Sequence, residues 1–126
     1  CNGFRTAGPD RKVNGAFRSG GQPDYPSAEN DLVQNFASAA ADGNGSNDGD
    51  YKNPEFDALC DKAAASKSVA DANKLYQQAQ EVLLNDLPAV PLYYANAYGV
   101  ASTGVSGFEM NWQNLPVYEN MTKSGK

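Results

Sequence analysis

Two adjacent amphipathic helices, predicted within residues 53–87, constrain the fold of this chain more than any other feature of its sequence. Asn53 is a favourable N-cap residue, and Pro54 suits the first helical position, where an N–H group would have no acceptor within the helix. Apolar residues then recur at intervals of three and four, which places them on one helical face. We therefore predict a helix from about Pro54 to Ala65 whose buried stripe comprises Phe56, Leu59, Cys60 and Ala63.

A second helix is expected directly after the first. Ser68 followed by Asp71 approximates a capping box with Asp in place of Glu, so the helix begins there. Pro88 ends it, because proline interrupts the hydrogen-bond ladder of a helix, and the two helices together form a hairpin. The predicted buried face of the second helix holds Leu75, Ala79, Val82 and Leu83, with Ala72, Tyr76 and Leu87 on its flanks.

The remaining apolar residues favour short strands. Residues 88–102 are rich in β-branched and aromatic side chains, and residues 104–121 form a second extended stretch with turns, followed by a loose tail. Two more strand-like pieces, Phe4–Ala7 and Ala16–Ser19, lie around turn signals at residues 8–10 and 14–15. The sequence therefore predicts an α/β fold in which the helix hairpin packs on a small mixed sheet.

Residues 20–30, with the sequence GGQPDYPSAEN, form a stiff loop that leads into a short helix begun by Ser27. Asp24 and Tyr25 stand between Pro23 and Pro26, and each proline fixes its own φ and biases the residue before it toward extended backbone. A carboxylate held in this way could face a cleft and bind a ligand ammonium group. An Asx-turn or a local cap would place Asp24 equally well, so the residue chemistry leaves both interpretations open.

Composition argues against several classes of function. The chain has 126 residues, the size of one domain, and its net charge of −5 argues against nucleic-acid binding. No apolar run approaches the roughly 20 residues that span a bilayer, and the N-terminus lacks the pattern of a signal peptide. Histidine is absent, which removes Ser-His-Asp and Cys-His catalysis and the usual zinc sites. We expect a protein that is not an enzyme and that uses no cofactor or metal.

The two cysteines allow more than one interpretation. Cys1 and Cys60 permit at most one intramolecular disulfide, but Cys60 falls on an apolar helix face, where a buried free thiol is also expected. An N-terminal cysteine is in addition the residue with which a mature bacterial lipoprotein begins.

Two other groups of residues offer alternative sites. In the loop at residues 42–50, Asp42, Asn44 and Ser46 place oxygen ligands at alternating positions, as in a calcium site. The EF-hand pattern fails, because its sixth position is Asn47 rather than Gly and its twelfth is Asn53 rather than Glu, so a solvated loop is the competing interpretation. The second group is aromatic, and its members either form a binding face or pack half-buried on the helix hairpin: Tyr93, Tyr94 and Tyr98.

The order of these pieces resembles a known family. The Asp-Tyr-Pro loop is followed by AEN, a spacer rich in Gly, Ser and Asn, then YKNPEFDALCDKAAA, ANKLYQQAQEVLLNDLPAVPLYYANA and a VSGF turn. This series is similar to the C-terminal part of the family 5 (oligopeptide/dipeptide) solute-binding proteins of ABC importers, especially the actinobacterial members. The resemblance covers nearly the whole chain, most firmly residues 24–107.

The resemblance implies a two-lobed α/β periplasmic-binding-protein fold (type II), of which this chain would be a partial lobe. Family members are several times longer, so residues 1–126 are expected to be a single C-terminal fragment or domain, with about 108–126 returning toward the other lobe. The implied location is the extracellular face of the cytoplasmic membrane or the periplasm. Contact with the membrane would be made only through an N-terminal lipid anchor outside this chain.

The resemblance also assigns a binding site. In oligopeptide receptors of this family the aspartate of the Asp-Tyr loop pairs with the free α-amino group of the ligand, a role that falls here on Asp24. Gln22 and Pro23 would line the entry, next to Gly21 and Tyr25. Gly21 stands where members usually have Trp, and Pro23 has no N–H to donate to the peptide main chain.

The function implied is that of an extracytoplasmic receptor that binds oligopeptides and delivers them to the permease subunits. The remaining lobes of the full-length receptor are expected partners, and the fragment alone should bind weakly or not at all. Two alternatives stay open at this point: an independent extracellular interaction module, and a domain stabilised by calcium in the loop at residues 42–50.

Overall fold

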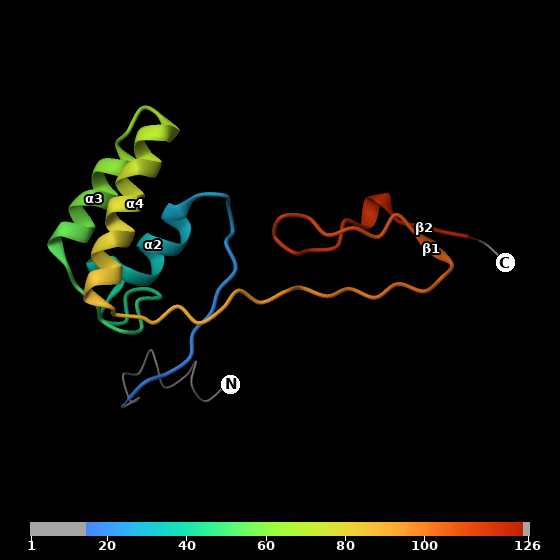
Figure 1. The fold of residues 1–126 in the computed structure, drawn as a ribbon, viewed down its shortest axis with the longest axis horizontal. Helices are drawn as coiled ribbons and strands as arrows, with labels where there is room; N and C mark the ends of the chain where they lie inside the picture. Colours follow the sequence, from blue (N-terminus) through green and yellow to red (C-terminus); the bar gives the residue numbers. More distant parts are fainter. Residues whose placement is uncertain (1–14, 125–126) are drawn as a thin grey trace. The chain divides into compact units, whose positions relative to one another are not determined.

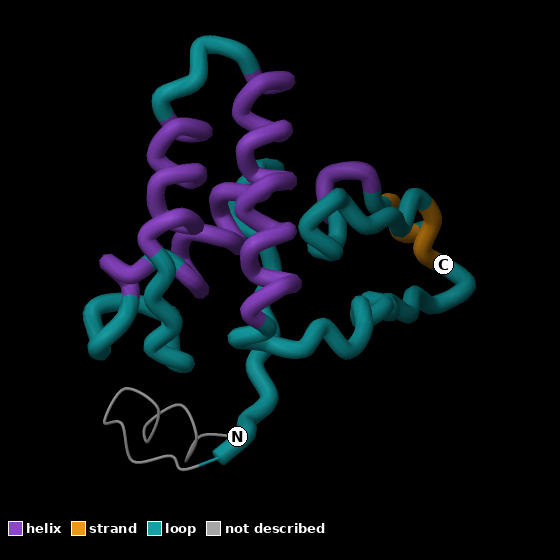
Figure 2. Tube along the Cα trace, turned by 60° about the vertical axis from the view of Figure 1, so that its left-hand side comes forward, coloured by secondary structure: helices purple, strands orange, loops and turns teal. Residues whose placement is uncertain are grey.

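The computed structural model describes residues 15–124, and the chain divides into two compact units, Cys1–Val90 and Pro91–Lys126. We refer to residues 15–90 as the helical unit and to residues 91–124 as the C-terminal unit. Three α-helices lie in the first and both described strands lie in the second (Figures 1 and 2). The predicted strand at Phe4–Ala7, the turn at residues 8–10 and any bridge to Cys1 fall outside the described residues.

The predicted helix hairpin is confirmed, together with its caps. α3 (Pro54–Ala64) begins at Asn53, whose Oδ1 accepts hydrogen bonds from the backbone N–H groups of Glu55 at 2.8 Å and Phe56 at 3.3 Å. α4 (Val69–Asp86) begins at Ser68, whose hydroxyl oxygen accepts from Asp71 N–H at 3.2 Å. These bonds satisfy N–H groups that a helix leaves without internal acceptors. In Figure 1, α3 and α4 lie side by side along most of their length.

The short helix after Ser27 is also confirmed and forms the third layer of the core. α2 (Ala28–Phe36) packs against both helices of the hairpin. Phe36, Tyr51 and Phe56 form three edge-to-face ring pairs with centroids 6.0–6.5 Å apart, an arrangement that aromatic quadrupoles favour. A one-turn 3₁₀ helix, η1 (Ser38–Ala40), follows α2. The buried core residues are Leu32, Ala37, Phe56, Cys60, Ala63, Tyr76, Ala79 and Leu83.

The buried stripe of α4 is rotated relative to the prediction. Tyr76, predicted on the flank, is buried, whereas Leu75 and Val82 are only partly buried and Leu87 is exposed. Tyr76, Ala79 and Leu83 follow the i, i+3, i+7 spacing of one helical face, so Tyr76 belongs to the buried face instead of its flank. α4 ends at Leu87, which takes the left-handed conformation at φ 48° before Pro88.

The predicted mixed sheet under the hairpin is wrong in its composition. The described sheet has two antiparallel strands, β1 (Val105–Ser106) and β2 (Thr122–Lys123), and both belong to the C-terminal unit. Val105 lies opposite Lys123 and Ser106 opposite Thr122, so the tail predicted as loose is partly paired. A mixed sheet needs a third strand, and neither Ala16–Ser19 nor the stretch at residues 88–102 pairs with one among the described residues. The α/β class itself is confirmed.

Residues 88 and 89 form a bend, and residues 90–102 follow an extended path with no assigned strand (Figure 1). Their large side chains are exposed, including those of Val90, Leu92 and Val100. A strand is stable only when its backbone N–H and C=O groups have a partner strand, and the described residues supply none here. This stretch therefore has the composition of a strand but does not form part of a sheet among the described residues.

The C-terminal unit is organised around a close backbone approach. Beyond β1, Gly107 has φ 73°, and a Cβ placed there would lie 2.0 Å from the carbonyl oxygen of Asn120. Only glycine fits at this point. The remaining regular elements are an isolated bridge between Met110 and Pro116 and a second 3₁₀ turn, η2 (Tyr118–Asn120).

Candidate functional site

The predicted site residues form one exposed loop at the N-terminal end of α2. We define the Asp24 loop as residues 20–27; Gln22, Asp24 and Tyr25 are exposed in it and Pro23 is half-buried. Ser27 N–H donates to the carbonyl of Tyr25 at 2.9 Å, which closes a three-residue turn around Pro26. The loop therefore turns sharply just before the helix, as the two prolines predicted.

The two glycines at the start of the Asp24 loop are not required by packing among the described residues. A Cβ built at Gly20 or at Gly21 would meet no atom of residues 15–124 within 4 Å. A larger side chain at Gly21 would meet no local obstruction. The absence of the usual Trp therefore leaves this side of the loop open within the helical unit.

The anchor of the loop is Asn30, which the sequence reasoning missed. Its side-chain oxygen accepts a hydrogen bond from the backbone N–H of Asp24 at 2.7 Å, across six residues. Asn30 is 3% exposed and belongs to α2, so the acceptor is buried and its backbone is held by the helix. Asn30 stands two residues before Leu32 and therefore lies off the apolar stripe of α2, so no sequence pattern identified it. The bond ties the backbone of Asp24 to the first turn of α2.

The loop at residues 42–50 is organised by the protein's own groups. Asn47 is buried, its amide donates to the carbonyls of Ala37 at 3.0 Å and Tyr51 at 2.8 Å, and its Oδ1 accepts from Tyr51 N–H. Asp42 forms an ion pair with Lys52 at 2.5 Å. Within residues 15–124 no cluster of three or more Asp, Glu or Cys side chains is arranged to hold a metal ion. Asn47 thus has a structural role in this loop.

A polar cluster joins the end of α4 to the start of α3. Asp86 accepts hydrogen bonds from the hydroxyl of Tyr51 at 2.6 Å and from the side-chain amide of Asn53 at 2.7 Å. These two donors, Tyr51 first, lower the pKa of Asp86 below its ordinary value. Burial, and then the bond to Asp86, raises the pKa of Tyr51 to about 12. The cluster bridges two helices and is a structural feature.

Cys60 is confirmed as a buried free thiol. Burial is the main cause that raises its pKa to about 11, and the nearby carboxylates of Asp57 and Asp61 add to the shift. A thiol with a raised pKa is a weak nucleophile at neutral pH. Cys60 therefore acts as an apolar core residue.

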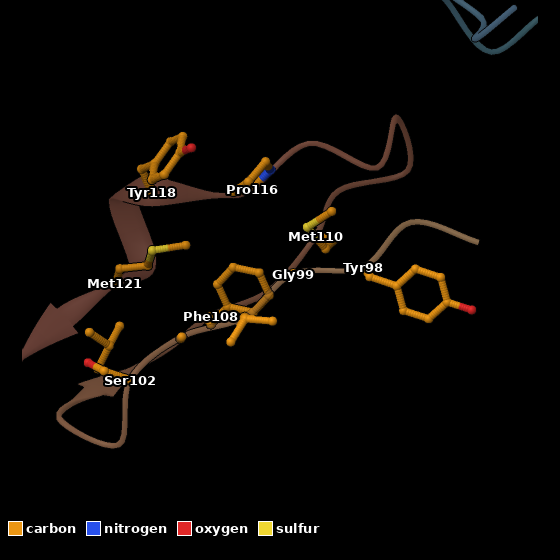
Figure 3. A pocket seen from close by; sticks show the side chains of 11 residues that line it. Tyr98, Gly99, Ser102, Phe108, Met110, Pro116, Tyr118 and Met121 are labelled. Atoms are coloured by element: carbon orange, nitrogen blue, oxygen red, sulfur yellow. The ribbon is translucent and has the colours of Figure 1, made fainter. Parts of the chain in front are cut away.

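The C-terminal unit has a shallow apolar pocket of about 420 Å³ that the sequence did not reveal (Figure 3). Phe108 lies at its centre and covers Gly99 closely, because a Cβ at Gly99 would lie 2.1 Å from the ring. The lining residues carry no ionisable acid or base except the tyrosines Tyr98 and Tyr118. The pocket could accept an apolar group and offers no charged partner for a ligand.

The three predicted aromatic residues are exposed. Tyr93, Tyr94 and Tyr98 all lie in the extended part of the C-terminal unit, and Tyr94 is fully exposed. The half-buried packing expected for strand tyrosines is therefore not seen in this chain. Among residues 15–124 we find no helix with the length and apolar character that a membrane span needs.

The chain is similar in sequence to several known proteins. No family model matches the chain. It is 33% identical over 102 residues to di/tripeptide-binding protein 4 of Pseudomonas aeruginosa, a match that covers 81% of this chain and 18% of that protein. It is 34% identical over 58 residues to the peptide transport periplasmic protein SapA of Haemophilus influenzae, covering 46% of the chain and 10% of that protein.

A third relative extends the range of ligands. The chain is 32% identical over 65 residues to the probable deoxycholate-binding periplasmic protein YgiS of Escherichia coli, covering 52% of the chain and 12% of that protein. The chain spans less than a fifth of the length of each of these three relatives. It is thus a distant, partial homologue of periplasmic solute-binding proteins, including peptide-binding ones, as its sequence resemblance predicted. The actinobacterial type stays a prediction.

Proposed function

We propose that this chain is the C-terminal part of an extracytoplasmic solute-binding protein of an ABC importer, which binds oligopeptides and delivers them to the permease. The observation that carries this proposal is the match over 81% of the chain to a di/tripeptide-binding protein. The match covers 102 residues, which is more than the whole of Pro91–Lys126 can hold, so most of it falls in Cys1–Val90. The function is binding and transfer, without catalysis.

In this proposal Asp24 binds the α-amino group of the peptide. The Asp24 residue is exposed, and its backbone is fixed by the bond from Asp24 N–H to Asn30. A loop that is already ordered loses less entropy when a ligand binds, and an ammonium–carboxylate pair is a charge-assisted hydrogen bond. Gly21, Gln22, Pro23 and Tyr25 form the adjacent surface, on which side-chain contacts would be made.

The remainder of the receptor is needed for strong binding. An ion pair exposed to water contributes only about 0–1 kcal/mol, because water competes for both charges. A second lobe that closes over the loop would exclude water and strengthen the pair, and the ligand would favour the closed state by contacting both lobes. This is why the fragment alone should bind peptides weakly or not at all.

The extended stretch at residues 88–102 is the surface that joins the rest of the receptor. Its exposed apolar side chains, including Val90, Leu92 and Val100, gain stabilisation when they are buried, at about 25 cal/mol per Å². Its backbone is extended and can add a strand to a sheet. The relatives are more than five times the length of the matched segment, so a large protein surface is available to supply that sheet.

The proposal is tested by the selectivity of the full-length receptor that contains this chain. Asp24→Asn should weaken binding of trialanine by roughly 10- to 100-fold, because a hydrogen bond to a charged group is worth about 1.5–3 kcal/mol. Binding of N-acetyl-trialanine should change little, because it has no ammonium group. Isothermal titration calorimetry measures both affinities.

Asp31→Asn is the matched control, because it removes the same charge from an exposed position in the first turn of α2. It should leave the affinity ratio of the two peptides unchanged. Equal losses for both peptides in Asp24→Asn would assign Asp24 a structural role and contradict the proposal.

A further inference from the structure

Asn30 is an unusual residue for its position in the helical unit. It lies in the first turn of α2 and is 3% exposed, although it is a polar residue. Its Oδ1 accepts a hydrogen bond from Asp24 N–H at 2.7 Å. The other half of the same amide, Nδ2, is buried and has no hydrogen-bond acceptor among the described residues.

The Asp24 N–H group determines how the Asn30 amide is oriented. Rotating the amide by 180° would place its NH₂ group against the Asp24 N–H, so that two donors would face each other. Oδ1 must therefore point toward Asp24, and Nδ2 takes the opposite position, where it is buried. Nδ2 therefore has no acceptor because Oδ1 of the same amide is bound to the Asp24 N–H.

Stability alone would favour a different residue at this position. Burying an amide donor without an acceptor opposes folding, and leucine has the same branched shape with no polar atoms. Asparagine at this position lowers stability through its buried donor and provides a fixed contact to a surface loop. Such an exchange is typical of residues that serve a binding site.

We propose that Asn30 is the positioning residue of the Asp24 loop, and that it holds the Asp24 backbone so that the carboxylate can meet the amino group of a peptide. Asn30 acts through Asp24 and does not itself touch the ligand. This inference rests on the proposed function, and it names the residue on which the selectivity of that site depends.

The test compares three variants of the full-length receptor with the wild type: Asn30→Leu, Asn30→Asp and Asp24→Asn. Asn30→Leu should weaken trialanine binding roughly 3- to 10-fold, the range expected for one hydrogen bond, and should leave N-acetyl-trialanine unchanged. Its melting temperature should equal or exceed that of the wild type, because the orphan donor is gone. Asn30→Asp keeps an oxygen acceptor for Asp24 N–H and should retain the wild-type preference for the free amino terminus.

Hydrogen exchange supplies a readout that needs no ligand. In the wild-type receptor the Asp24 amide should exchange more slowly than the amide of Gln22, which is exposed in the same loop. The Asn30→Leu variant should remove this difference. Equal exchange at Asp24 and Gln22 in the wild type would overturn the inference even if no variant folds.

The outcomes separate this inference from the function on which it rests. Loss of selectivity in both Asp24→Asn and Asn30→Leu supports the two together. Loss in Asp24→Asn alone overturns the role of Asn30 and leaves the proposed function standing. Unchanged selectivity in Asp24→Asn overturns both. A lower melting temperature with unchanged selectivity in Asn30→Leu would make Asn30 a structural residue only.

Discussion

The helical unit and the C-terminal unit differ in what they bury. The helical unit packs three helices around a core in which Phe56 and Ala79 are completely buried. In residues 91–124, by contrast, no described residue is buried, and large side chains such as those of Tyr94 and Trp112 are exposed. Large apolar side chains occur in both units, so their presence alone does not explain the difference.

The difference lies in where the packing partners are in the chain. α3 and α4 are adjacent in sequence, and α2 precedes them by fewer than 20 residues, so each helix finds its partner locally. The C-terminal unit has two strands of two residues each, and a two-stranded hairpin is marginally stable at best in water. The helical unit therefore forms its own core from neighbouring helices, whereas the described residues of the C-terminal unit form no buried core.

The largest effect is expected from truncating the core of the helical unit. Phe56→Ala removes a completely buried ring that contacts Phe36 and Tyr51, and such changes lower the free energy of unfolding by about 3–5 kcal/mol. Tyr94→Ala, in the exposed part of the C-terminal unit, should change it by less than about 0.5 kcal/mol. Urea denaturation followed by helical circular dichroism measures both; similar losses would contradict the contrast between the units.

A smaller and more local effect is expected at Gly107. Gly107→Ala places a Cβ 2.0 Å from the carbonyl oxygen of Asn120, at a φ of 73°, and strain of this kind is worth about 1–3 kcal/mol. Pairing of Val105 with Lys123 should then be lost, which nuclear Overhauser contacts would report, while the helical signal stays unchanged. The control is Gly104→Ala, whose Cβ would lie an ordinary 3.4 Å from Ser124 Oγ and should preserve the pairing. If β1 and β2 stay paired in Gly107→Ala, the close approach at Gly107 is not needed for their pairing.

The smallest effect is the acid dependence of the helical unit. Hydrogen bonds from Tyr51 and Asn53 lower the pKa of Asp86 below its ordinary value of 3.8, so the ionised form is favoured in the folded state. The stabilisation is present above pH 3.8 and is lost as the pH falls through the lower pKa of the folded state. Asp86→Asn should reduce this acid-linked loss of stability.

Asp61→Asn, which removes an exposed carboxylate from α3, is the control for the acid dependence. Thermal melts between pH 5 and pH 2 would compare the two variants with the wild type. A wild-type and an Asp86→Asn profile of the same shape would show that the cluster at Asp86 is not linked to folding.

Local chemistry made the helical unit predictable from sequence. The side chains of Ser27, Asn53 and Ser68 each cap the helix that the sequence assigned to them, because a cap depends on neighbours within three residues. The rotated face of α4 was less predictable. Leu75 and Tyr76 are both suitable core residues, and only the position of α2 and α3 decides between them.

The strands could not be predicted, because pairing depends on distant chain. Residues 88–102 have strand composition, yet composition does not reveal whether a partner strand is present. At the site, the prolines revealed a stiff Asp24 loop, but not what holds it. The bond from Asp24 N–H to Asn30 depends on the path of the chain through the turn, and a single asparagine gives no pattern that predicts such a path.

The central claim, that this chain is one part of a peptide receptor, is tested most directly by titration of two proteins with the same ligands. A mixture of tri- to pentapeptides is titrated by calorimetry into the isolated chain and into the full-length receptor. The full-length receptor should bind with low-micromolar or tighter affinity, and the isolated chain should show weak or no binding. Low-micromolar binding by the isolated chain, or no peptide binding by the full-length receptor, would contradict the account.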